Sequence, residues 1–375
     1  MAGAYIHIPF CKSKCFYCDF YSVTNWDKAL IDRFFKAILK EIELRADFPV
    51  KPLRTIYFGG GTPSLFTTGL IQAIINKLKS TFNYSNDLEI TLEANPDDIN
   101  NEYVIKLKAE TEVNRISLGV QSFIDNHLKF LGRRHNVKQS LSAIDLFFKH
   151  NFSNISIDLI YGLPVMGLHD LEYNLTKFLE LDLPHISAYH LTIENGTVFG
   201  KLYRNGKLKQ IDEEQSIKQY SLLIDTLESH GYLHYEISNF AKTGFISKHN
   251  FSYWTDEPYI GLGPAAHSYD KKNRYWNQAN IKTYIEKIEK SQLPQHSEHL
   301  SLKDHFNEYI LTRLRTYLGI DPDFLNKKFP VFFNQIKPAI NQFIKSGHLK
   351  IYENRIILTR QGKFIADNII ADLFV

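Results

Sequence analysis

Short apolar runs of the kind that form β-strands alternate with longer helical patterns from the amino terminus to about residue 195. In the first helical segment, Leu30, Phe34 and Ile38 recur at helical spacing and predict a buried face. Such alternation is typical of a parallel sheet, open or closed, whose strands are connected by helices. The predicted strands are Tyr5–Pro9, Thr55–Phe58, Glu89–Glu93, Arg115–Val120, Ser156–Ile160 and His185–Leu191.

Residues that could carry chemistry fall near the ends of these predicted strands. Three cysteines follow the first strand and Gly59–Gly61 follows the second, while Glu93 ends the third, Gln121 follows the fourth and Asp158 lies in the fifth. In closed or partly closed β/α barrels, functional groups gather at the carboxyl ends of the strands. The sequence therefore predicts one site built from several separate segments.

All the cysteines of the chain, Cys11, Cys15 and Cys18, belong to one short segment, and no thiol follows them. This distribution excludes a disulfide framework and indicates a single site in a reducing compartment. Thiolates are the usual ligands of iron–sulfur clusters, although a four-iron cluster normally has four of them. Zinc held by the three cysteines and His7 is the alternative. His7 falls inside the first predicted strand, so it need not reach the cysteine loop.

Composition excludes several classes of protein. The chain carries 44 Lys and Arg against 41 Asp and Glu, a net charge of +3 that is too small to indicate nucleic acid or an anionic membrane as a partner. No apolar run approaches the roughly 20 residues that cross a bilayer. The amino terminus lacks the basic segment and apolar stretch of a secretory signal. We therefore expect a cytoplasmic protein, with no nucleic acid as partner.

The pattern changes in the second half of the chain. A long helix is predicted from about Asp212, ending at Gly231, and a region rich in aromatic residues follows. Farther on, helices precede a hairpin predicted from Leu349–Tyr352 and Arg355–Leu358. Helices with a hairpin resemble a winged-helix module, which suggests DNA binding only by analogy of fold. We expect a barrel over residues 1–231, a connecting region over 232–300 and a carboxyl-terminal domain over 301–375.

The cysteine segment CKSKCFYC, followed by GGGTPS, LEANP, LGVQSF and IDLIYGLP, resembles the radical S-adenosylmethionine superfamily. The resemblance implies an α/β fold, a partial (β/α)6 barrel with a helical, winged-helix-like carboxyl-terminal domain. It also implies that the three cysteines hold a [4Fe–4S] cluster whose fourth iron binds S-adenosylmethionine. A reductant such as flavodoxin or ferredoxin would supply the electron.

The same resemblance implies roles for individual residues. Gly60, Gly61 and Thr62 would cradle the methionine end of S-adenosylmethionine, because glycine lets the backbone approach a ligand closely. Glu93 would accept hydrogen bonds from the ribose. The other residues expected to line or adjoin the cofactor cavity are Tyr5, Tyr17, Gln121, Arg133 and Asp158. The glycines could instead make only a tight turn, and each polar side chain could be a structural partner.

Within the superfamily, the chain resembles two sister groups, the oxygen-independent coproporphyrinogen III dehydrogenases (HemN) and the HemW heme chaperones. The dehydrogenases have a further cysteine two residues after the third, where this chain has Phe20, and an extension before the first strand, where only four residues precede Tyr5. In contrast, HNFSYW at His249–Trp254 matches the HNxxYW signature of HemW. The HemW group is therefore favoured.

This resemblance implies a chaperone that binds heme and transfers it to heme-accepting proteins, through which any contact with a membrane would come. Neutral imidazole is a good iron ligand, and aromatic rings can stack on a porphyrin. His249 is therefore the expected heme ligand, with Tyr253 and Trp254 shaping the pocket and His267 as a second candidate. A histidine among aromatic residues can also be a packing element. A porphyrin-acting radical enzyme is the alternative function, because the complete cofactor apparatus is present.

Overall fold

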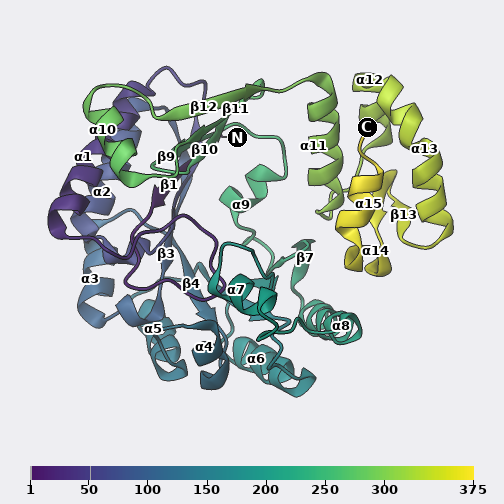
Figure 1. Cartoon of the computed structure of the whole chain (residues 1–375), viewed down its shortest axis with the longest axis horizontal. Coiled ribbons are helices and arrows are strands. Elements are labelled where there is room, and N and C mark those ends of the chain that lie inside the picture. The colour runs from purple at the N-terminus through teal and green to yellow at the C-terminus, as the bar shows by residue number, and fades with distance from the viewer. Residues whose placement is uncertain (1, 51) are drawn as a thin grey trace.

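The structure, a computed structural model, describes residues 2–50 and 52–375. Its larger part is built on a twelve-stranded sheet with the order β12-β11-β10-β9-β1-β2-β3-β4-β5-β6-β8-β7. The six strands at the centre are parallel and follow one another in chain order, as a β/α barrel requires (Figure 1). They are β1 (Ala2–Ile8), β2 (Leu53–Gly60), β3 (Tyr84–Ala94), β4 (Arg115–Gln121), β5 (Ile155–Tyr161) and β6 (His185–His190). All six predicted strands are present, and the α/β fold is confirmed.

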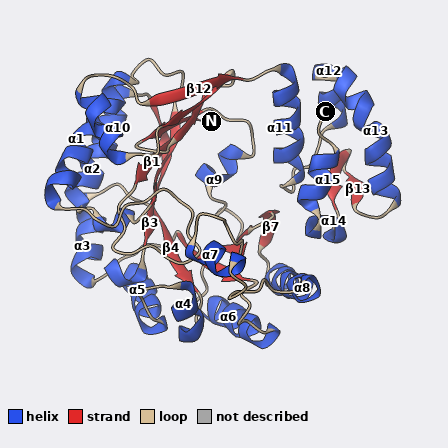
Figure 2. Cartoon of the chain, viewed as in Figure 1, coloured by secondary structure: helices blue, strands red, loops and turns tan. Residues whose placement is uncertain are grey.

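Helices cover the outer face of these parallel strands (Figure 2). Apolar side chains such as Ile6, Ile56 and Leu92 are fully buried in the core that includes the helices' apolar faces. Alternate residues such as Tyr57 and Glu93 bond to each other on the inner face, so each central strand separates an apolar layer from a polar lumen. The helices are α1 (Lys28–Leu44), α2 (Thr68–Thr81), α3 (Asn101–Glu110), α4 (Asp125–Leu131), α5 (Val137–Lys149) and α6 (Leu168–Glu180).

The region after β6 extends the sheet at both of its edges. Strands β7 (Leu233–Glu236) and β8 (Asn239–Ala241) pair beyond β6, whereas β9 (Tyr259–Leu262), β10 (His267–Tyr269), β11 (Asn273–Asn277) and β12 (Gln295–His299) extend it from β1. The helices here are α7 (Val198–Arg204), α8 (Glu213–Ser229), α9 (Lys248–Tyr253) and α10 (Ile281–Glu289). Residues 232–300 are thus part of the same sheet as the central strands.

The carboxyl-terminal part has a core of its own, which includes Phe306, Leu325 and Ile369. Figure 1 shows its helices packed together to one side of the sheet. The elements are α11 (Leu302–Leu314), α12 (Pro322–Lys328), α13 (Pro330–Lys345), β13 (Leu349–Tyr352), β14 (Arg355–Leu358), α14 (Arg360–Phe364) and α15 (Ala366–Asp372). The hairpin has the predicted bounds, and Glu353 and Asn354 at its turn both have positive φ, as a two-residue hairpin turn of type I′ needs.

No helix among the described residues is both long and apolar enough to cross a membrane.

Candidate cofactor site

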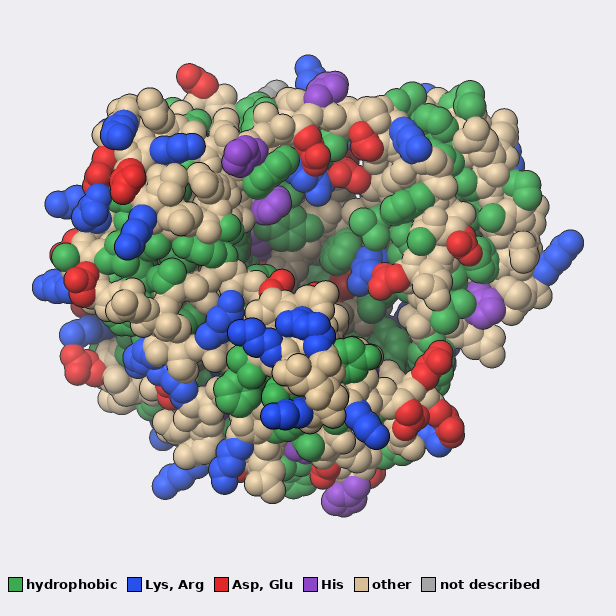
Figure 3. All heavy atoms as spheres, in the orientation of Figure 1, with side chains coloured by type: hydrophobic (Ala, Val, Ile, Leu, Met, Phe, Trp, Pro, Cys, Tyr) green, Lys and Arg blue, Asp and Glu red, His purple; other side chains and the backbone are tan. Residues whose placement is uncertain are grey.

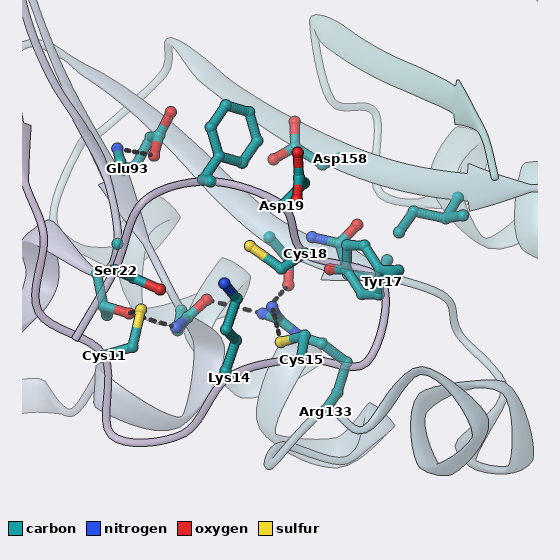
Figure 4. Close-up of a pocket in the computed structure, with 18 of the residues that line it drawn as sticks. Cys11, Lys14, Cys15, Tyr17, Cys18, Asp19, Ser22, Glu93, Arg133 and Asp158 are labelled. Atoms are coloured by element: carbon teal, nitrogen blue, oxygen red, sulfur yellow. Dashed lines mark hydrogen bonds between the residues drawn. The ribbon is translucent and has the colours of Figure 1, made fainter. Parts of the chain in front are cut away.

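A cavity of about 660 Å³ lies where the central parallel strands end, and we call it the cysteine cavity. Its walls come from the loop after β1, the turn after β2 and the ends of β3 to β6 (Figure 4). The structure brings together most of the expected cofactor residues: Cys11, Cys15, Tyr17, Cys18, Gly60, Gly61, Thr62, Glu93, Gln121, Arg133 and Asp158. Tyr5 does not line this cavity.

A chain of hydrogen bonds connects two of the thiols. The Thr62 hydroxyl donates to Sγ of Cys11 (3.6 Å) and accepts from Nδ2 of Asn95 (3.2 Å). Arg133 donates to Oδ1 of Asn95 (2.7 Å) and to Sγ of Cys15 (3.4 Å). Asn95 was not among the expected site residues, although it lies two residues after Glu93 in LEANP. Its amide fixes the positions of both Thr62 and Arg133.

These residues fit an anionic, thiolate-ligated group. Burial raises the pKa of the Cys11 and Cys18 thiols, so in the absence of a metal partner they stay protonated near neutral pH. Arg133 places a cation beside Cys15, and its buried Nε has no hydrogen-bond partner within the described residues. Three thiols around one cavity, next to an incompletely paired guanidinium, match the charge and ligand type of an iron–sulfur cluster.

The glycines at the end of β2 allow a close approach between β2 and β1. Gly60 has a φ of +106°, and a Cβ there would lie 2.6 Å from the His7 ring. The amide of Gly60 donates to Glu93 Oε2 (3.2 Å), and that of Gly61 donates to the Ile8 carbonyl (2.7 Å). Both amides therefore already have protein partners. The turn function of these glycines follows from this geometry, whereas contact with a cofactor stays a prediction.

Two carboxyl groups face the cavity from the inner side of the sheet. Burial raises the pKa of Glu93 to about 7, against hydrogen bonds from Tyr57 and Gly60 that lower it. Burial likewise raises the pKa of Asp158 to about 6, and the Asp158 charge further disfavours ionisation of Glu93. Near pH 7, Glu93 is therefore close to half-ionised, whereas Asp158 is mostly ionised. Burial removes the water that would solvate these carboxylates. Ligand groups that donate hydrogen bonds to them, such as ribose hydroxyls, would favour the charged forms of Glu93 and Asp158.

Gln121, at the end of β4, has a φ of +67°. This left-handed conformation costs a residue other than glycine about 1–3 kcal/mol, and such strain tends to occur at functional sites. It places the Gln121 side chain in the wall of the cysteine cavity.

His7 is bonded on both ring nitrogens. Its Nε2 contacts the Tyr21 carbonyl (2.8 Å), and its Nδ1 contacts the Tyr5 hydroxyl (3.0 Å). His7 therefore secures the end of the cysteine loop instead of joining the cysteines, which argues against the zinc alternative. Tyr5 lies deeper in the barrel, where its ring is 6.4 Å from that of His249.

The HNFSYW motif forms most of α9 and the residue after it, and Figure 1 shows α9 near the middle of the molecule, between the sheet and α11. Figure 3 shows that this face of the molecule is hollowed near its centre. The Glu89 carboxylate accepts from the amides of Lys248 and His249 and fixes the helix to β3. His249 is only 1% exposed; its Nδ1 bonds Thr55 (2.7 Å) and its Nε2 bonds Tyr253 (2.9 Å). Burial lowers the pKa of His249 to about 3.

The structure therefore does not bring the expected heme residues into the cysteine cavity. To bind iron, His249 would have to give up a hydrogen bond and leave its buried position. Trp254 instead lies against the guanidinium of Arg315, 5.8 Å from its carbon to the ring centre. His267 is exposed at the start of β10 and stacks on Trp276, with 6.2 Å between the ring centres.

Comparison with known proteins places this site in a family. Residues 5–176 match the model of the radical SAM superfamily, and residues 300–365 match that of the HemN C-terminal domain. The heme chaperone HemW of Lactococcus lactis is 36% identical over 98% of this chain and 96% of its own length. The chain belongs to the HemW family. The HemW of Bacillus subtilis is 35% identical, with 98% of both chains covered.

The fold agrees with this assignment. The solved structure of coproporphyrinogen III oxidase (HemN) from Escherichia coli, a radical SAM enzyme, superposes with a TM-score of 0.85 and covers all of this HemW-family chain and 90% of its own. The sequence identity of that pair is 21%, so the likeness concerns the fold. The barrel and the carboxyl-terminal domain are thus found together in both groups.

Proposed function

We propose that this chain is a heme chaperone, which binds heme and passes it to heme-accepting proteins. The observation that carries the proposal is the near-complete alignment with proteins named heme chaperone HemW. It is supported by Phe20, which occupies the position of the further cysteine expected in coproporphyrinogen dehydrogenases. The protein would act in the cytoplasm, where thiols stay reduced.

In this proposal, Cys11, Cys15 and Cys18 hold a [4Fe–4S] cluster. Arg133 compensates part of its negative charge, and Thr62 orients one sulfur. S-adenosylmethionine would occupy the rest of the cysteine cavity, with Glu93 as the acceptor for its ribose hydroxyls. When bound and reduced, the cluster can supply an electron to the sulfonium of S-adenosylmethionine. A flavodoxin- or ferredoxin-type protein would be the reductant.

The second candidate is a porphyrin-acting radical enzyme, which is favoured by the complete set of polar residues around the cysteine cavity. A chaperone that only carried heme would not need the buried, desolvated carboxyl groups of Glu93 and Asp158 in the lumen. The two functions make opposite predictions about turnover. A chaperone releases the tetrapyrrole unchanged, whereas a dehydrogenase oxidatively decarboxylates coproporphyrinogen III.

The test uses the full-length protein with its cluster reconstituted without oxygen. Heme is titrated into it and the Soret band is followed; an apo-acceptor such as a heme-free cytochrome then tests transfer. In a parallel sample, coproporphyrinogen III, S-adenosylmethionine and reductant are added and the porphyrin products are analysed. We expect saturable heme binding and no decarboxylation. Decarboxylation at many turnovers per chain, or no heme binding, would refute the chaperone function.

A further inference from the structure

A second cavity, of about 560 Å³, lies beside the cysteine cavity and shares with it the segment Tyr189–Thr192. It is enclosed by the ends of β5 and β6, the start of α8, and helices α14 and α15. The carboxyl-terminal domain thus forms one of its walls. Its volume lies in the range of about 300–1,000 Å³ that is usual for pockets that bind small molecules and cofactors.

Aromatic rings form one wall of the second cavity. Tyr161 and Tyr220 lie parallel, with 6.0 Å between ring centres and an angle of 7°. His190 meets the Tyr161 ring edge-on at 5.2 Å, and Phe364 meets the Tyr220 ring edge-on at 5.7 Å. A row of flat rings of this kind favours a flat, aromatic ligand.

Two cations lie at the other side of the second cavity. Arg315 pairs with the exposed Asp367 through one nitrogen, while its buried Nε has no hydrogen-bond partner among the described residues. Lys363 is half-buried and its Nζ donates to Nδ1 of His234 (2.8 Å). The carboxylates of Glu213 and Asp367 also line the cavity, so its charge is mixed. The incompletely bonded Arg315 fork is suited to a carboxylate, because guanidinium and carboxylate form paired hydrogen bonds.

His190 supplies a metal ligand at the junction of the two cavities. Its Nε2 has a single bond, to the Ser216 hydroxyl (2.8 Å). Gly162 lies so close that a Cβ there would be 2.5 Å from this nitrogen, so a larger residue would displace the imidazole. Unlike the buried His249, His190 lies in a cavity wall. It can bind iron once the Ser216 hydroxyl rotates away from its Nε2.

From these observations we infer that heme binds in the second cavity, with His190 as its axial ligand and Arg315 and Lys363 as the partners of its propionates. A metal ligand, flat aromatic walls and two cations together match a metalloporphyrin that carries two carboxylates. The HNFSYW motif then acts on this site indirectly: Trp254 holds Arg315 by a cation–π contact. The inference rests on the proposed heme chaperone function.

The test compares heme binding by the cluster-reconstituted wild type with that of His190→Ala, Arg315→Gln and Lys363→Gln. His190→Ala should shift the Soret band and weaken binding about tenfold or more, because an axial ligand is lost. Each Gln variant should weaken heme binding on the order of tenfold, since a charge-assisted hydrogen bond is lost. With heme dimethyl ester, which has no free carboxylates, the Gln variants should bind as well as wild type.

Ile217→Trp provides a variant that alters no charge. Ile217 lines the second cavity and is exposed, so the larger side chain should obstruct heme while the fold is kept, as checked by the unfolding temperature. Wild-type heme affinity and spectrum in both His190→Ala and Ile217→Trp would overturn the inferred site. That result would leave the chaperone function standing, whereas wild type that bound no heme would refute the function itself.

Discussion

Replacing Glu93 by Gln should stabilise the cofactor-free protein at pH 8 and change its stability little at pH 5. The pKa of Glu93 is about 7 in the folded protein, against 4.5 for an ordinary glutamate. Each unit corresponds to about 1.4 kcal/mol, so ionised Glu93 costs the folded state up to about 3 kcal/mol. Gln has nearly the same shape, carries no charge and keeps one oxygen that can accept from Tyr57. Its amide nitrogen cannot accept from the Gly60 amide, so the net gain should be smaller than this upper figure.

The direction with pH follows from the raised pKa. Below pH 4.5, Glu93 is protonated in both the folded and the unfolded state, so ionisation of Glu93 does not lower the free energy of unfolding. Between pH 4.5 and about 7 only the unfolded state ionises, so stability falls as the pH rises, and it levels off above pH 7. The Gln variant should lack this component of the pH dependence.

The measurement is denaturant unfolding of the reduced, cofactor-free protein at several pH values, followed by circular dichroism. Asp158→Asn is the matched comparison. Because the pKa of Asp158 is about 6, its loss of stability with rising pH should be complete about one pH unit lower than that of Glu93. Equal pH dependence in wild type and Glu93→Gln would refute the assigned protonation. In the cluster-loaded protein, Glu93→Gln should also weaken S-adenosylmethionine binding if Glu93 receives the ribose.

Two further predictions concern the cluster and the packing. Cys15→Ser should reduce the iron content from about four per chain to well below one, whereas the control Ser13→Ala in the same loop should keep it. The measurement is iron analysis after anaerobic reconstitution, and full iron content in Cys15→Ser would contradict the ligand assignment. Arg45→Met should destabilise the fold by about 3–5 kcal/mol, because it leaves the buried Glu41 carboxylate without its cation. The exposed pair made by Arg33 is the control, and Arg33→Met should cost at most about 1 kcal/mol in the same unfolding assay.

The central strands could be predicted because their apolar side chains repeat at every second residue, as Ile116, Leu118 and Val120 do in β4, and because helical patterns separate the strands. The short strands at the sheet edges could not. His267–Tyr269 and Asn239–Ala241 have three residues each, and they are ordered by pairing with distant segments instead of by a local pattern. The predicted hairpin is the opposite case, since its two strands and its Glu353–Asn354 turn are contiguous in sequence.

The site residues divide in the same way. The positions of the three cysteines and Glu93 at strand ends were enough to predict that they share a cavity, whereas Arg133, which follows α4, was expected there only from the family resemblance. Motif matching could not predict which partners each group has. Gly60 shows the consequence: a change to Val would force a Cβ against the His7 ring at a positive φ, so loss of cofactor binding in that variant would not separate a ligand contact from a strained turn.

The HNxxYW motif identifies the family, yet its histidine is bonded to the barrel on both nitrogens and its helix is capped by Glu89. These contacts give the motif a structural function that needs no ligand. His249 in α9 bonds to Thr55 of β2 and Glu89 of β3. Trp254 contacts the guanidinium of Arg315, the residue that follows α11. A helix in this position couples the polar lumen to the carboxyl-terminal domain. Changes in the motif would therefore disturb heme binding even if His249 never touched iron, and only spectra that report the axial ligand can separate the two effects.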